Sequence, residues 1–144
     1  APPASWVAVA HSFGCLALAH HLGERQRDPR RDVETGGVAA ALLVAPAEPD
    51  RFGVAVALPQ QGLGVPSVLL ASDTDPWLRA DRAAHWAERW GASFINLGDV
   101  GHINVDSGFG PLPRALQATQ ALMRRVEGSR RPSRAGVLEF GFST

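Results

Sequence analysis

The sequence contains no lysine and no tyrosine, and it has a single cysteine, Cys15. One cysteine excludes an internal disulfide and a zinc site built from cysteines. We expect Cys15 to be a small buried apolar residue rather than a nucleophile. The 14 basic residues, all arginine, balance 14 acidic residues, so the formal net charge is zero. Because no region is strongly basic, nucleic acid is not expected as the main partner.

Long hydrophobic runs are also lacking, so the chain is not expected to cross or bind a membrane. The uncharged segment Trp6 to Leu22 is interrupted by histidines and a serine, and no basic region precedes it. It therefore does not resemble a secretory signal, and we expect a cytoplasmic protein. The chain opens at Ala1 and reaches an apolar strand almost at once, so we expect further sequence upstream.

The composition is that of a single globular domain, with 144 residues, 45% of them hydrophobic and 19% charged. Apolar runs that suit buried strands alternate with helical patterns. Strands are expected at 6–10, 38–45, 66–72 and 93–97, and helices at 13–22, 77–90 and 113–126. This alternation predicts an α/β fold, a three-layer αβα sandwich with a mostly parallel sheet of about four strands.

The connecting segments divide the chain into a domain at 1–127 and a C-terminal tail at 128–144, within which 137–142 could add a strand. Residues 23–34 carry mixed charges and suit a solvated loop. Residues 47–65 are irregular, and loops of this length often bind ligands. The tryptophans at 77–90 are interpreted as packing residues. In the last helix we expect an apolar stripe of Leu116, Ala118, Leu122, Met123 and Val126.

One serine, Ser12, stands where the first strand is expected to turn into the first helix. It lies in the run Ala10-His11-Ser12-Phe13-Gly14. This is close to the Gly-x-Ser-x-Gly pattern of a nucleophile elbow, with alanine at the first position. Such a turn projects the hydroxyl above the sheet, at the N-terminus of a helix that favours negative charge. The alternative is an ordinary polar residue that caps the helix.

Two further polar residues, Asp75 and His102, follow expected strands and complete the chain order Ser, Asp, His. The carboxyl ends of parallel strands meet at one edge of the sheet, so the three residues could form a catalytic triad there. Asp75 precedes Pro76 and could instead cap a helix, and Asp73 is a rival acid. His102 could make structural hydrogen bonds only. His11 should point to the opposite side of the turn from Ser12, and no histidine–carboxylate spacing indicates a metal site.

The elbow, the run Val44-Ala45-Pro46, the segment 71–76 and above all the segment 98–111 resemble the small α/β-hydrolases related to retinoblastoma-binding protein 9. The resemblance covers about residues 6–125, and bacterial members of that family are regarded as serine esterases. It implies that Ser12 is the nucleophile, Asp75 the acid and His102 the base. It further implies that the Phe13 amide belongs to the oxyanion hole. The candidates for contact with substrate are His11, Asn104, Ser107 and Phe109.

The chain departs from that family at its start, where members usually have another strand, a Pro-Gly loop and a helix before the elbow strand. The loop ordinarily supplies a second oxyanion-hole amide, and losing one donor typically costs about two to three powers of ten in rate. The missing strand could also expose a sheet edge and allow self-association.

We therefore expect a serine hydrolase that acts on small acyl esters through Ser12, Asp75 and His102 and needs no cofactor. The alternative is a non-catalytic hydrolase-fold protein that acts as a binding or interaction module.

Overall fold

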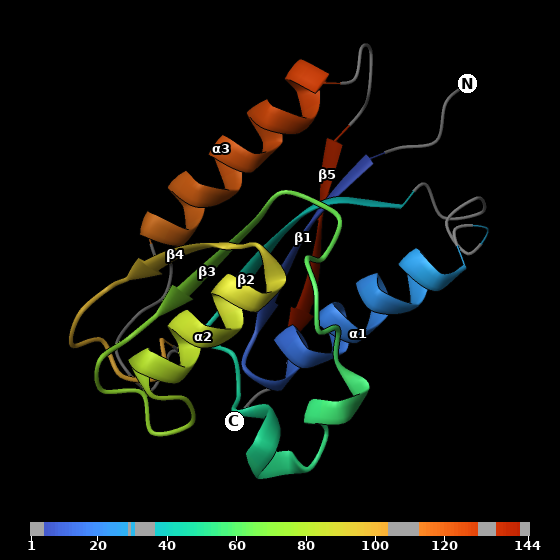
Figure 1. Ribbon diagram of the computed structural model, residues 1–144. Helices are drawn as coiled ribbons and strands as arrows, with labels where there is room; N and C mark the ends of the chain where they lie inside the picture. The colour runs from blue at the N-terminus through green and yellow to red at the C-terminus, as the bar shows by residue number, and fades with distance from the viewer. Residues whose placement is uncertain (1–4, 29, 31–36, 104–112, 130–134, 142–144) are drawn as a thin grey trace.

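The computed structural model describes residues 5–28, 30, 37–103, 113–129 and 135–141. Five strands form one sheet, in the order β4-β3-β2-β1-β5, and every neighbouring pair is parallel. The strands are β1 (Ser5–His11), β2 (Val38–Val44), β3 (Ser67–Ala71), β4 (Ser93–Asn96) and β5 (Ala135–Gly141). The parallel arrangement expected from the sequence is confirmed, with one more strand (Figure 1).

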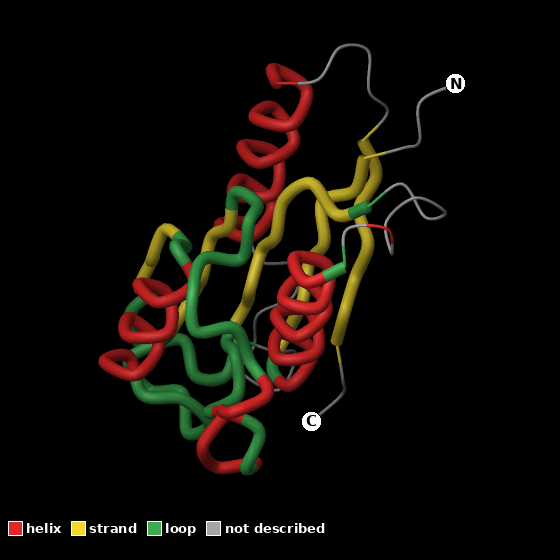
Figure 2. The backbone as a smooth tube through the Cα atoms, turned by 45° about the vertical axis from the view of Figure 1, so that its right-hand side comes forward, coloured by secondary structure: helices red, strands yellow, loops and turns green. Residues whose placement is uncertain are grey.

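Helices cover both faces of this sheet (Figures 1 and 2). The helices are α1 (Phe13–Arg27), α2 (Ala80–Trp90) and α3 (Pro113–Ser129). Helices α1 and α2 pack on one face and α3 on the other, so each face has its own cluster of buried apolar side chains. Two short 3-10 helices, η2 (Pro49–Phe52) and η3 (Ala55–Ala57), lie in the connection between β2 and β3. The expected three-layer αβα sandwich is confirmed.

The central strand β2 shows why the apolar runs of the sequence form strands. Successive side chains of a strand point to opposite faces, and both faces of this sheet are covered. Ala41 and Leu43 therefore enter the core beneath α1 and α2. Ala40 and Leu42 enter the core beneath α3. A strand in this position has no solvent-facing side, which explains its unbroken apolar sequence.

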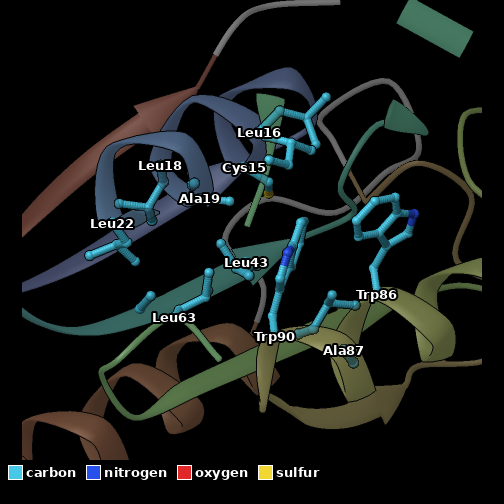
Figure 3. Packing of buried hydrophobic residues seen from close by; sticks show 14 of the residues in the cluster. Cys15, Leu16, Leu18, Ala19, Leu22, Leu43, Leu63, Trp86, Ala87 and Trp90 are labelled. Carbon is cyan, nitrogen blue, oxygen red and sulfur yellow. The ribbon is translucent and has the colours of Figure 1, made fainter. Parts of the chain in front are cut away.

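The core on the α1 and α2 side is built around Trp90, which is 1% exposed (Figure 3). Its ring lies 5.1 Å from that of Trp86. Its indole N–H donates to the carbonyl oxygen of Pro59 at 3.0 Å, which ties α2 to the β2–β3 connection. Helix α2 ends at Trp90, and its C-cap is Gly91, whose φ of 67° glycine adopts without strain.

We expect Trp90→Ala to lower the free energy of unfolding by about 3–5 kcal/mol, because it removes a large buried side chain and leaves a cavity. Urea unfolding measures this loss. Glu88→Ala, at an exposed position of the same helix, is the control and should change stability by less than about 0.5 kcal/mol. A Trp90→Ala variant as stable as that control would contradict this description of the core.

The C-terminal segment, expected as a tail that could add a strand, does contribute one. Residues 135–141 form β5 and pair in parallel with β1 from Ser5↔Ala135 to His11↔Gly141. Strand β5 therefore covers the edge of β1, where an open edge was expected, and the outer strands of the described sheet are β4 and β5.

Three helices also differ in detail from their expected form. Helix α1 continues to Arg27, because Arg25 and Gln26 hydrogen-bond to the carbonyl oxygens of Val38 and Gly62 and anchor its last turn. Helix α2 begins at Ala80 rather than at 77. In α3, Leu122 and Val126 are buried as expected, but Leu116 is 58% exposed.

Candidate active site

The turn between β1 and α1 holds Ser12 in a backbone conformation that few residues other than glycine adopt, with φ 57° and ψ −127°. Hydrogen bonds fix this turn. The Ser12 amide donates to the carbonyl oxygen of Val44 at 3.0 Å, and the Ser12 carbonyl accepts from the amides of Cys15 at 3.0 Å and Ala47 at 3.3 Å. Strain of this kind persists only where the surroundings enforce it, and it is frequent at functional sites. The turn has the form expected of a nucleophile elbow.

Three predicted residues from distant parts of the chain meet at this turn. The Oγ of Ser12 lies 2.8 Å from Nε2 of His102. The Nδ1 of His102 lies 3.0 Å and 3.1 Å from the two carboxyl oxygens of Asp75. An ionised carboxylate only accepts, so Nδ1 carries the proton and Nε2 is left to accept from the serine hydroxyl. All three residues are nearly buried, Ser12 at 2%, His102 at 5% and Asp75 at 6% exposed.

Asp75 is oriented by a second hydrogen bond, since its Oδ1 accepts from the backbone amide of Trp77 at 2.9 Å. Because α2 begins at Ala80, with Arg79 at its N-cap, Asp75 is not the cap of that helix. The rival acid, Asp73, is exposed and accepts instead from the side chain of Asn96 at 2.8 Å. The structure thus brings Asp75, not Asp73, to His102.

The loop that carries His102 is bound to the loop that carries Asp75 through two hydroxyl groups that the sequence analysis did not single out. The Oγ of Ser72 accepts from the amide of Val100 at 3.2 Å. The Oγ1 of Thr74 accepts from the amide of Gly101 at 3.0 Å and donates to the carboxylate of Asp99 at 2.7 Å. These bonds fix the distance between the acid and the imidazole. Serine and threonine in the run 72–75, just after a strand, were the available signal.

His11 contacts the backbone of the histidine loop. Its Nε2 donates to the carbonyl oxygen of His102 at 2.9 Å, and the two rings lie 4.8 Å apart. The next residue, Ile103, is buried with φ 55°, a strained conformation for a β-branched residue. His11 therefore helps to hold a strained loop in place. Contact of His11 with a substrate stays a prediction.

A series of aromatic rings leads from His102 to the start of α1. Trp77 lies 6.2 Å from His102 and stacks on Phe52 at 6.4 Å, and Phe52 meets Phe13 edge-on at 5.3 Å. The guanidinium of Arg51 lies 5.0 Å from the Trp77 ring centre. Trp77, interpreted from the sequence as a packing residue, does stack on Phe52. It lies outside α2, beside His102, and is 36% exposed.

Three predicted site residues, Asn104, Ser107 and Phe109, lie outside the described residues. Phe13 is the first residue of α1, directly after Ser12. Among the residues that the structure describes, no group of three or more histidines, cysteines or carboxylates is placed to hold a metal ion.

Cys15 is fully buried one turn beyond Ser12, and its thiol donates to the carbonyl oxygen of Val44 at 3.4 Å. Burial raises the pKa of this thiol well above its ordinary value. The thiolate is the reactive form, so we expect no reaction of the native protein with iodoacetamide at pH 8, but full reaction in urea. Intact mass measures both. Alkylation of Cys15 in the folded protein would contradict the described packing of α1.

The parallel sheet, the strained serine turn and the buried imidazole–carboxylate pair define an α/β-hydrolase-like protein. The chain matches the model of the serine hydrolase family over residues 2–121 and belongs to that family.

Among solved structures, the chain is similar to a protein described as a YdeN-like hydrolase from Pectobacterium atrosepticum, with 33% identity and a TM-score of 0.73. The match covers 83% of this chain and 60% of that one, so the chain spans less than two thirds of that hydrolase. A search of curated proteins gave no match. These findings confirm the expected hydrolase family. A closer relation to retinoblastoma-binding protein 9 stays a prediction.

Within the described part of the chain, no helix has the length and apolar character needed to cross a membrane.

Proposed function

We propose that this serine hydrolase cleaves small carboxylic esters through a catalytic triad of Ser12, His102 and Asp75. The observation that carries the proposal is the continuous hydrogen-bonded line from the Ser12 hydroxyl through both ring nitrogens of His102 to the Asp75 carboxylate. A serine hydroxyl is a weak nucleophile unless an adjacent base removes its proton and a third group orients that base.

In the proposed reaction, Ser12 Oγ attacks the ester carbonyl while His102 Nε2 takes the hydroxyl proton. The Asp75 carboxylate stabilises the imidazolium that forms. The oxyanion lies at the N-terminus of α1, where the Phe13 amide donates to it and the helix dipole favours negative charge. The imidazolium then protonates the leaving alcohol, and the acyl group stays on Ser12. Water, activated by His102, hydrolyses this acyl-enzyme to the carboxylic acid and restores the serine.

The alternative is a hydrolase-fold module that binds an ester or another protein without turnover. The two functions differ in whether an acyl-enzyme forms. With p-nitrophenyl acetate in excess over the protein, the proposed enzyme should release p-nitrophenol and carry a transient acetyl group on Ser12, seen by intact mass and peptide mapping. A folded protein that binds the ester but never becomes acetylated would support the binding module and overturn the esterase.

The cytoplasmic location and the self-association through a sheet edge stay predictions. Analytical ultracentrifugation can test the self-association.

A further inference from the structure

A groove of about 270 Å³ lies next to the proposed active site, between α1 and η3. From α1 it is lined by Phe13, Leu16, Ala17 and His20, which follow the spacing of one helix face, and from the other side by Val54, Ala57 and Leu58. The groove therefore begins at the residue directly after Ser12 and runs along α1.

The chemistry of the lining is apolar except for His20. Its Nδ1 lies 3.1 Å from the carbonyl oxygen of Ala57, so this nitrogen already has a partner and the contact joins the two walls of the groove. The lining contains no arginine, aspartate or glutamate. A carboxylate or an ammonium group would lose its hydration here without gaining a partner, whereas a hydrocarbon chain would lose nothing.

Phe13 connects the groove to the reacting atoms. Its ring lines the groove and also touches Phe52, at the end of the aromatic series that begins beside His102. In the acyl-enzyme the acyl carbon is bonded to Ser12 Oγ, one residue from Phe13. The groove offers the rest of the acyl group an apolar surface that begins at Phe13.

We propose that the groove binds the hydrocarbon chain of the acyl group, so that the substrates are esters of medium-length acids whose acyl chains carry no charge. This rests on the esterase function proposed above. An apolar cavity of about 150 Å³ is large enough for benzene. A groove of 270 Å³ therefore accommodates the acyl chain of a hexanoate.

The test compares p-nitrophenyl acetate with p-nitrophenyl hexanoate, which share a leaving group, on the wild-type chain and on Ala17→Phe. The larger side chain fills the groove from α1. We expect the wild type to favour hexanoate over acetate in kcat/KM by at least about tenfold, and Ala17→Phe to lose that preference. His21→Phe adds the same ring at an exposed position of α1 outside the groove and should keep the preference.

Binding is measured separately from catalysis by titrating hexan-1-ol into methyl-labelled protein. Chemical-shift changes at the methyl groups of Leu16, Val54 and Leu58 that are lost in Ala17→Phe support the groove. If these changes occur but no ester is hydrolysed, only the esterase proposal fails. Hydrolysis of acetate with no preference for hexanoate and no shifts at these methyl groups would overturn the groove and leave the esterase standing. If the protein hydrolysed neither ester and no methyl group shifted, both the groove and the esterase would be overturned.

Discussion

Replacing Ser12 by alanine is expected to lower kcat for p-nitrophenyl acetate by at least about 10⁴-fold, to the level that binding and the oxyanion site alone provide. The hydroxyl is the group that forms the covalent bond, so no neighbouring side chain can replace it. Cys15, the nearest alternative nucleophile in sequence, is fully buried and its raised thiol pKa keeps it protonated.

The control for this variant is Ser93→Ala, at an exposed position of β4, which should leave the rate unchanged. The prediction also requires that Ser12→Ala remain folded, which urea unfolding checks. A folded Ser12→Ala variant that keeps more than about a tenth of the wild-type rate would show that the reaction does not pass through this serine.

The second large effect is expected for Asp75→Asn, which should lower kcat by about 10⁴-fold with little loss of stability. The asparagine oxygen can still accept from the Trp77 amide, so the loop keeps its local hydrogen bond. The imidazole, however, loses the carboxylate that holds the proton on Nδ1 and stabilises the imidazolium. Without the carboxylate the imidazole can carry its proton on Nε2, and this nitrogen then cannot accept the proton of the Ser12 hydroxyl.

Asp73→Asn is the matched control, because Asp73 lies in the same loop but contacts Asn96 instead of His102. Its rate should stay within about threefold of the wild type. If Asp73→Asn lost activity and Asp75→Asn kept it, the assignment of the acid made from the geometry would be wrong.

The serine turn could be predicted from the sequence because its form depends on local features. These are a short apolar strand, small residues two positions before and after Ser12, and a helix rich in alanine and leucine directly after it. It also placed Asp75 and His102 at the correct edge, because parallel strands align their carboxyl ends. Both inferences need only chain order and secondary structure.

The choice between Asp73 and Asp75 could not be derived from the residues alone, because both follow the same strand two positions apart. It depends on the turn in which Oδ1 of Asp75 accepts from Trp77. The stacking of Phe52 on Trp77 depends in the same way on how two connections meet, the one between β2 and β3 and the one between β3 and α2. The addition of β5 depends on pairing between residues about 130 positions apart, such as His11 and Gly141. Local sequence patterns do not encode such long-range pairing.

The most direct test of the account is reaction of the 144-residue chain with a fluorophosphonate probe, read by intact mass and peptide mapping. This probe forms a bond to a serine only where a base activates it. We expect stoichiometric labelling at Ser12 that is lost in Ser12→Ala and in His102→Ala. A chain shown to be folded that remains unlabelled, or that is labelled equally without His102, would contradict the proposed triad.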